Sequence, residues 1–376
     1  MQAERIGIIG GYGAGGLACA RALLSTASCD ILIGGRNVEK LREAAAELGP
    51  RVRGAVVDLS DPKELEAFCR ECRLVVNCAG PSRRILDTIA LAALRANAHY
   101  IDLGGDEPLF ERLSPLHDEL RKKNLTFILS VGIYPGLSGL FTSFCIETAP
   151  KPVSAVESHF ISEGEPMTPN AAYDVVCSLE DGFGEGMARY ENGEVKRGGV
   201  GPVWLDLPPP GKERLLVYPS LTQEMVQLAK RHKLTAAGSY VALPPATMQT
   251  LFAVHADKQY LTETDKTAAA ERLAEASQRD CNGRPPRTIY HLVMRGAAGA
   301  ESATATLRHE EGSARLTGLI VGCAAAIVLA GKDCRAGRHM LPEALRSTAL
   351  MDLLAEYGIA PTMPLDAEDG MDSGFI

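Results

Sequence analysis

A short glycine-rich segment near the start of the chain has the residue types and spacing of a phosphate-binding turn. It reads Gly11-Tyr12-Gly13-Ala14-Gly15-Gly16, and it lies between an apolar run at 5–10 and a run with helical spacing. In such a turn the first glycine permits a tight bend, the second lets the backbone approach a pyrophosphate, and the third brings helix close to strand. The helix N-terminus then offers free N–H groups to the phosphates. The segment therefore predicts dinucleotide binding, and a purely structural glycine turn is the alternative.

The end of the second predicted strand indicates which dinucleotide binds. An NAD-binding protein usually has Asp or Glu here to bond the ribose 2′-hydroxyl, but this chain reads Gly34-Gly35-Arg36-Asn37. The planar guanidinium of Arg36 suits a 2′-phosphate, so NADP(H) is favoured over NAD; a solvated surface arginine is the alternative. The other residues expected beside the cofactor lie near strand ends: Asn37, Asp58, Asn77, Ala79 and Gly80.

Strand and helix patterns alternate through about the first 130 residues. Buried-type apolar runs are separated by stretches with helical spacing, which predicts a Rossmann-type, doubly wound parallel sheet with helices on both faces. Ligands of such sheets bind beyond the carboxyl ends of the strands. The nicotinamide is therefore expected among residues 77–82, 102–107 and 134–138. The predicted strands are 5–10, 29–35, 52–59, 73–80, 99–105 and 125–132.

The pattern changes after about residue 150. Clusters of β-forming residues with longer polar connections predict a second α/β domain with a mainly antiparallel sheet. Helices are expected near 169–179, 223–233 and 264–279, followed by a long apolar helix at 313–331 and a last helix at 340–359 that returns to the first domain. The predicted divisions are a cofactor domain at 1–134, a substrate and dimerisation domain at 135–334, and a C-terminal helical segment at 335–376.

The composition argues against several classes of partner. The 376 residues carry 39 Lys and Arg against 47 Asp and Glu, a net charge of −8, which disfavours nucleic acid and anionic membranes. The apolar run at 316–330 is short for a membrane span and contains two glycines, so a buried helix is expected. No signal-peptide pattern opens the chain, and the ten scattered cysteines are expected to be reduced thiols in the cytoplasm. No set of residues has metal-ligand spacing.

Several motifs appear in the order and spacing of one known family. They are "GGYGAGG", "GGRNVEKL", "VVNCAGP", "AHYIDLGGDE" and "VGIYPGLSGL", and near the end "VMRGAAG" and "AGKDCRAGRHMLPEAL". The sequence resembles the saccharopine dehydrogenase and saccharopine reductase-like NADP-binding enzymes. The resemblance implies a Rossmann domain completed by C-terminal helices, an inserted α/β substrate domain, and a homodimer formed through that second domain. Residues 165–285, which would contact the substrate, depart from the family, and the chain is shorter than typical saccharopine reductases.

The resemblance implies chemistry at a carbon–nitrogen bond. Members of the family commonly oxidise or reduce such bonds, and a smaller group resembles thiazolinyl imine reductases, which act on a carrier-protein-bound ring in pyochelin-type siderophore assembly. NADPH-dependent reduction of an imine or thiazoline, presented by a peptidyl carrier protein, is the expectation. The alternatives are a saccharopine-type amino-acid dehydrogenase or reductase, a trans-acting enoyl reductase, and a non-catalytic NADP-binding sensor.

Reduction of C=N also requires a proton for the nitrogen, which Tyr, His or a carboxylic acid with a raised pKa can supply. Tyr134 precedes Pro135-Gly136 on a turn at the predicted mouth, with aromatic packing as the alternative. Asp102 ends the fifth strand, where a loop hydrogen bond is the alternative. The remaining candidates are Tyr173, on a helix that begins at Thr168 or Asn170, and His99, at the far end of the fifth strand; packing roles are the alternatives for both.

Overall fold

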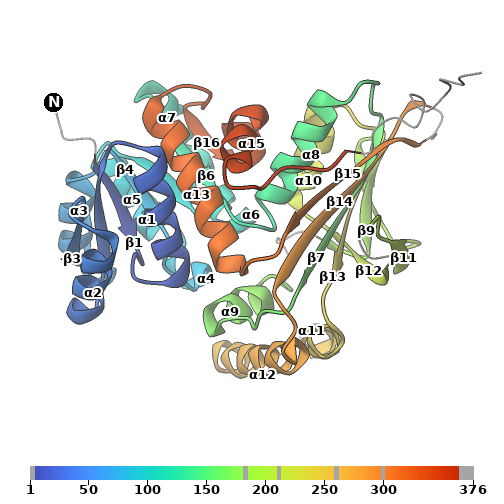
Figure 1. Ribbon diagram of the computed structural model, residues 1–376, viewed down its shortest axis with the longest axis horizontal. Helices are drawn as coiled ribbons and strands as arrows, with labels where there is room; N and C mark the ends of the chain where they lie inside the picture. Colours follow the sequence, from blue (N-terminus) through green and yellow to red (C-terminus); the bar gives the residue numbers. More distant parts are fainter. Residues whose placement is uncertain (1–4, 181–184, 210–212, 258–261, 298–300, 364–376) are drawn as a thin grey trace, which may run out of the picture.

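A computed structural model describes residues 5–180, 185–209, 213–257, 262–297 and 301–363 and shows two lobes side by side (Figure 1). The first lobe contains a seven-stranded sheet in the order β16-β6-β5-β4-β1-β2-β3, with every neighbouring pair parallel. The predicted α/β class and Rossmann-type parallel sheet are therefore confirmed. Its strands are β1 (Arg5–Ile9), β2 (Asp30–Gly35), β3 (Val52–Val56), β4 (Leu74–Asn77), β5 (His99–Asp102), β6 (Thr126–Leu129) and β16 (Gly337–Met340).

Helices cover both faces of this sheet, because the central strands are apolar on both sides. Local capping explains where several helices begin: the Asn37 side chain accepts a hydrogen bond from Lys40 N at the start of α2, and Asp61 caps α3 ahead of Pro62. The helices are α1 (Ala14–Thr26), α2 (Val38–Leu48), α3 (Pro62–Arg70), α4 (Ser82–Ile85), α5 (Thr88–Arg95), α6 (Asp106–Arg112) and α7 (His117–Lys122), with a 3-10 turn at Ser114–Leu116.

The long apolar helix α13 (Ser313–Ala330) packs along α1, the helix that follows the glycine turn (Figure 1). Glycines permit the close approach: a Cβ at Gly318 would lie 2.2 Å from Ala18 Cβ, and one at Gly322 would lie 2.5 Å from Ala22 Cβ. Among the described residues α13 alone is long and apolar enough to cross a membrane by length and composition. Of its residues, 67% are buried within the protein, as the sequence predicted for a core helix.

The second lobe contains a nine-stranded mixed sheet. Most of its pairs are antiparallel, as predicted, but β7 and β13 at its centre are parallel. The strands are β7 (Ala155–Glu163), β8 (Glu185–Gly186), β9 (Ala188–Glu191), β10 (Glu194–Arg197), β11 (Val203–Asp206), β12 (Arg214–Leu221), β13 (Ala236–Ala242), β14 (Arg287–Arg295) and β15 (Glu301–His309).

The helices of the second lobe form two groups (Figure 1). Two of them, α8 and α10, lie together against the sheet, whereas α9, α11 and α12 pack on one another at its end. Thr168 caps α9, as predicted. The bounds are α8 (Leu137–Thr148), α9 (Pro169–Cys177), α10 (Gln223–Arg231), α11 (Pro245–Asp257) and α12 (Glu263–Cys281).

Two predicted helices differ from the structure. The apolar spacing at 108–124 predicts one further helix, but the stretch divides around Pro115 into α6, a 3-10 turn and α7, because proline cannot donate to the helical ladder. The last helix, expected at 340–359, is replaced by the end of β16, then α14 (Leu341–Ala344) and α15 (Ser347–Ala355). Strand β16 forms because it can pair with β6 at the edge of the sheet. This pairing depends on the tertiary structure and cannot be predicted from the hydrophobic periodicity of the segment.

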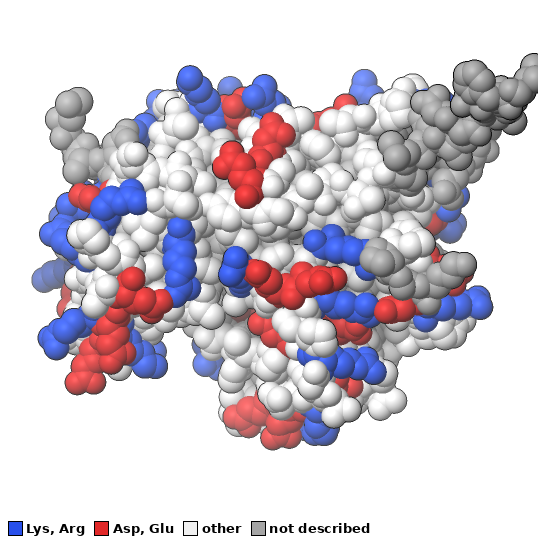
Figure 2. All heavy atoms as spheres, in the orientation of Figure 1, with Lys and Arg blue, Asp and Glu red and all other residues white. Residues whose placement is uncertain are grey.

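Charged side chains of both signs are interspersed over the face of the molecule shown in Figure 2. This distribution is the one that a modest negative net charge suggests.

Candidate active site

The glycine turn between β1 and α1 has the geometry of a phosphate cradle. A Cβ at Gly11 would lie 2.5 Å from Ile33 Cβ, and a Cβ at Gly16 would lie 2.4 Å from the Gly10 carbonyl oxygen, so neither position accepts a side chain. Gly13 occupies the capping position directly before α1 and has no side chain to cap the first turn. The N–H groups of that turn are therefore available to an anion. These residues fit the pyrophosphate of a dinucleotide.

The nucleotide end of the site is built around Tyr12 and the end of β2. The Tyr12 ring lies against Gly35, where a Cβ would be 2.3 Å from Tyr12 Cε1, and the Lys40 ammonium lies 6.0 Å from the ring centre. Arg36 extends from the same strand end into solvent. The Asn37 side chain is used as the cap of α2, because its oxygen accepts from Lys40 N at 2.9 Å. The side chain of Asn37 thus shapes the site rather than reaching into it.

Asp58 is exposed next to this end of the sheet. Its carboxylate accepts a hydrogen bond from Ser60 N at 2.9 Å. That bond and the charge of Arg36 lower the pKa of Asp58 below its ordinary value. A carboxylate and a guanidinium near the end of β2 and β3 can bracket the ribose and phosphate of an adenosine group.

Asn77 and Asp102 form a buried network that ties the ends of β4 and β5 together. Asn77 Nδ2 donates to Asp102 Oδ2 at 3.1 Å, and Asn77 Oδ1 accepts from Ala79 N at 2.9 Å. Asp102 also accepts from the Tyr100 hydroxyl and from Gly104 N. Burial raises the pKa of Asp102 to about 6 against the opposing effect of these bonds. Both side chains therefore shape the two turns, and Asp102 is engaged inside the protein with 2% exposure.

The backbone of Ala79 and Gly80 leads directly into α4, where the second lobe contacts the first. The carboxylate of Asp174, on α9, accepts from Ser82 N at 2.9 Å and from Arg83 N at 3.1 Å. Gly80 faces the same helix, since a Cβ there would lie 3.5 Å from the Asn170 side chain. The substrate-side loop of the cofactor site is thus held from the other lobe.

Tyr173 lies on the same helix as Asp174 but belongs to a different contact. Its hydroxyl donates to Glu263 on α12 at 2.5 Å, and the Arg84 guanidinium lies 4.3 Å from its ring centre. The side chain is only 3% exposed. The structure places Tyr173 in the packing between α4, α9 and α12.

Tyr134 lies in the loop that joins β6 to α8. Its hydroxyl donates to the Ser220 carbonyl at 2.7 Å, and its ring stacks on Phe160 at 4.9 Å between centres. Burial raises the pKa of Tyr134. Tyr290 holds the same loop by donating to the Ile133 carbonyl at 2.8 Å. The predicted position on a turn is correct, and the hydroxyl is directed toward the second sheet.

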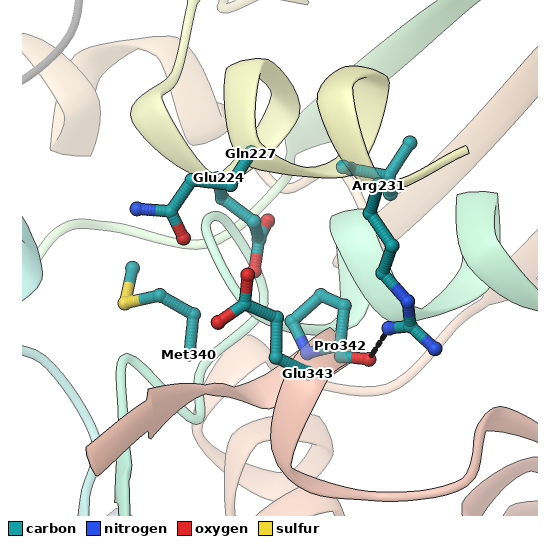
Figure 3. A pocket seen from close by; sticks show the side chains of 7 residues that line it. Glu224, Gln227, Arg231, Met340, Pro342 and Glu343 are labelled. Atoms are coloured by element: carbon teal, nitrogen blue, oxygen red, sulfur yellow. Dashed lines mark hydrogen bonds between the residues drawn. The ribbon is translucent and has the colours of Figure 1, made fainter. Parts of the chain in front are cut away.

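A buried carboxylate from α10 anchors the next part of this loop. Glu224 accepts from Gly136 N at 3.0 Å and from the Ser138 hydroxyl at 3.2 Å, at the start of α8. It is 3% exposed, and burial raises its pKa to about 8 although both hydrogen bonds oppose the rise. Glu224 also lines a small hollow between α10 and the segment that contains Met340 and Pro342 (Figure 3).

His99 lies at the opposite edge of the sheet, at the amino end of β5. Its Nδ1 accepts from Thr126 N at 3.0 Å, and burial lowers its pKa to about 4. A neutral, hydrogen-bonded imidazole at this edge has a structural role. Among the described residues no group of three or more His, Cys, Asp or Glu could hold a metal ion.

The structure thus brings together the glycine turn, Arg36, Asp58 and the Asn77–Asp102 network, with Tyr134 near the same edge. It separates Tyr173 and His99 from them. Sequence reasoning did not single out Asp106, Ser130, Asp174 or Glu224. Asp106 lies inside the expected range 102–107, in the motif "GGDE", which could have marked it as a candidate. Asp174 directly follows Tyr173, which was itself a candidate. No sequence signal pointed to Glu224, because its hydrogen-bond partner Gly136 is 88 residues away.

Residues 6–128 match the family model described as the saccharopine dehydrogenase NADP binding domain. This part of the chain is similar to that domain. NADP(H) is accordingly its cofactor, as Arg36 and the absence of an acid at the end of β2 predicted. The expected resemblance is confirmed at the level of this domain.

Two curated relatives and one solved structure show how far the similarity extends. A trans-acting enoyl reductase of Mycobacterium leprae is 33% identical over 25% of this chain and 24% of its own length. A carboxyaminopropylagmatine dehydrogenase of Synechocystis is 27% identical over 38% of each chain. Saccharopine dehydrogenase (L-Glu forming) from Saccharomyces cerevisiae superposes with a TM-score of 0.67 at 14% identity, covering 96% of this chain and 100% of that chain.

These matches differ in what they support. The structural likeness, at low identity, establishes a shared two-lobed fold. The chain covers only 24% to 38% of the lengths of the curated relatives that it matches. Together with the cofactor domain they support an NADP-dependent oxidoreductase.

Proposed function

We propose that this protein is an NADPH-dependent oxidoreductase that reduces a C=N bond. The observation that carries the proposal is the cofactor site: a glycine turn that opens α1 without a side-chain cap, with Arg36 where an NAD-binding protein would have an acid. A bound NADPH supplies a hydride beyond the carboxyl edge of the sheet. There the second lobe contacts the loops at 77–82 and 130–138 through Asp174 and Glu224.

The preference for C=N rests on the acidic character of this edge. Burial raises the pKa values of Asp106 and Glu224, and the charges of neighbouring carboxylates add to both rises. Carboxyl groups that hold protons near neutral pH suit a reaction in which nitrogen gains a proton. The relative that is a carboxyaminopropylagmatine dehydrogenase also has a name that indicates an amine.

The finer form of the proposal is a thiazoline or imine held on a peptidyl carrier protein, reduced by a homodimer. Its basis is the resemblance of the chain to stand-alone family reductases and the divergence of residues 165–285. A panel assay tests it: NADPH consumption is measured with a thiazolinyl thioester on a carrier protein, the same thioester free in solution, and simple cyclic imines. We expect turnover with the imines and the highest kcat/KM with the carrier-bound ring.

Reduction of an activated C=C bond is the second candidate. It is favoured by the similarity to a trans-acting enoyl reductase, which is 33% identical over 102 residues. Adding an enoyl thioester to the same panel distinguishes the two reactions. Turnover of the enoyl thioester alone would replace the C=N proposal, and NADPH binding without turnover of any substrate would favour a sensor.

A further inference from the structure

Each of the four side chains predicted to donate a proton is either hydrogen-bonded inside the protein or distant from the carboxyl edge of the sheet. The hydroxyls of Tyr134 and Tyr173 donate to Ser220 O and Glu263. The Asp102 carboxylate accepts three hydrogen bonds inside the protein, and His99 lies at the amino edge of the sheet. A proton donor must instead lie at the carboxyl edge with one atom free to meet a substrate.

Asp106 occupies the point where four segments of this edge meet. The turn that precedes Asp106 contacts the phosphate turn, because a Cβ at Gly15 would lie 3.5 Å from Leu103 Cδ2. The same turn contacts α4, because a Cβ at Gly104 would lie 2.3 Å from Ser82 Oγ. From the β6–α8 loop, the Ser130 hydroxyl donates to Asp106 Oδ1 at 2.8 Å. The fourth segment is α9, which contributes the charge of Asp174.

The backbone at this point is specialised. Asp106 has φ of 42° and its partner Ser130 has φ of 56°, both in the left-handed region that non-glycine residues seldom adopt. Residues held in such conformations tend to occur at functional sites. Unlike Asp102, Asp106 keeps part of its surface exposed. One oxygen is oriented by Ser130, which leaves the other oxygen of the carboxyl group to carry a transferable proton.

We propose that Asp106 is the proton donor of the reduction, held in position by Ser130 at the junction of the two lobes. The inference rests on the C=N reduction proposed above and assigns one of its steps. Bound NADPH supplies the hydride to the carbon of the C=N bond. At Asp106 the O–H bond breaks and an N–H bond forms with the electron pair released from the π bond. The carboxylate then takes a proton from water, so that one imine, one NADPH and one proton yield one amine and one NADP⁺.

The surroundings of Asp106 keep its carboxyl group protonated to higher pH than usual. Burial raises its pKa to about 6, the charge of Asp174 adds to the rise, and the Ser130 hydrogen bond opposes it. From the other elements packed here, Glu224 on α10 and Asp102 on β5 also interact with its charge. The cation on β16, Arg338, is directed at Phe110 further along α6. Asp106 thus faces mainly anions.

The test compares Asp106→Asn with Glu111→Gln, the same change of a carboxyl to an amide at an exposed residue of the same helix. For Asp106→Asn we expect NADPH affinity within about twofold of wild type and a fall in kcat of about 100- to 10,000-fold, the usual contribution of a general acid. The kcat/KM of the wild type should decline above an apparent pKa near 6, and the variant should lose this decline. Glu111→Gln should retain the wild-type rate and pH profile.

A second readout needs no cofactor and no turnover. In protein labelled with ¹³C at the Asp carboxyl carbons, a resonance that titrates near pH 6 should disappear in Asp106→Asn and remain in Glu111→Gln. Wild-type rate and pH profile in Asp106→Asn, or an Asp106 resonance that titrates near its ordinary value, would overturn the assignment while leaving the reductase proposal intact. Wild-type protein that binds NADPH but reduces no C=N compound would overturn the proposed function itself, and the donor role with it.

Discussion

The two halves of the carboxyl edge are constructed differently. The nucleotide half consists mainly of one continuous segment, from β1 through the glycine turn and α1 to Arg36, with Asp58 beside it, and it offers mostly backbone N–H groups and an exposed cation. The substrate half is assembled from β5, β6, α9 and α10, and its functional groups are carboxylates with raised pKa values. The first half can bind a ligand that many proteins share, whereas the second half must recognise one particular substrate.

The two halves also differ in how far apart in the sequence the contacting residues lie. The cap of α2 joins residues three apart, and the phosphate turn spans residues 11–16. In the substrate half, Asp174 reaches Ser82 over 92 residues and Glu224 reaches Gly136 over 88. A change in the nucleotide half should therefore act on the cofactor alone, and one in the substrate half should act on pH dependence and on the fit between the lobes.

The largest effect is expected at Gly16, on the nucleotide side. In Gly16→Val the new Cβ would lie 2.4 Å from the Gly10 carbonyl oxygen, so the turn must open and its N–H groups must move. We expect NADPH binding to weaken by more than about 1,000-fold, equivalent to about 4 kcal/mol. Fluorescence titration with NADPH measures this, and Gly201→Ala, at a site with open space and an ordinary backbone conformation, controls for loss of a glycine. Retained affinity would mean that the turn does not bind the phosphates.

The next largest effect is expected at Glu224, on the substrate side. Its pKa is about 8 in the folded protein against an ordinary value of 4.5, so its contribution to stability is complete below pH 4.5 and is lost as the pH rises toward 8. Between pH 5 and pH 7 the free energy of unfolding of the wild type should fall by about 3 kcal/mol, at roughly 1.4 kcal/mol per pH unit, and Glu224→Gln should lose this decline. Urea unfolding at a series of pH values measures the slope. An unchanged slope would show that Glu224 is ionised at neutral pH.

Arg36→Ala should separate the two dinucleotides. Removing one charge-assisted hydrogen bond costs about 1.5–3 kcal/mol, so NADPH binding should weaken by roughly 10- to 100-fold. NADH lacks the 2′-phosphate, and its affinity should remain within about twofold because Arg36 then has no partner to lose. Titrating wild type and variant with both dinucleotides measures the ratio. Equal weakening for NADPH and NADH would place Arg36 outside the 2′-phosphate site.

The smallest effects are expected from the two tyrosines. Tyr134→Phe removes the bond to Ser220 O and Tyr173→Phe removes the bond to Glu263, each at about 0.5–1.5 kcal/mol of stability. Both variants should keep kcat within about twofold, since neither hydroxyl faces the substrate edge. Thermal unfolding and steady-state rates measure the two quantities. A fall in kcat at unchanged stability would indicate that the tyrosine takes part in the reaction and is again a candidate proton donor.

The sequence by itself determined the features that depend on neighbouring residues. Strand patterns, the glycine turn and Arg36 at the end of β2 are local, and they predicted the parallel sheet and its NADP(H) cofactor. The buried character of α13 was also evident, because eighteen residues of one apolar pattern allow little else.

Tertiary structure decided the rest, because burial and charge at a side chain depend on segments that are distant in the sequence. No local pattern shows that β16 pairs with the edge strand β6. Nor does one show that the Tyr134 hydroxyl donates to the Ser220 carbonyl, or that Asp102 accepts hydrogen bonds from several donors. The same holds for Asp106: a carboxylate after two glycines becomes a candidate acid only when Ser130 and Asp174 approach it from two other elements. Its chemistry is a property of the assembled edge of the sheet.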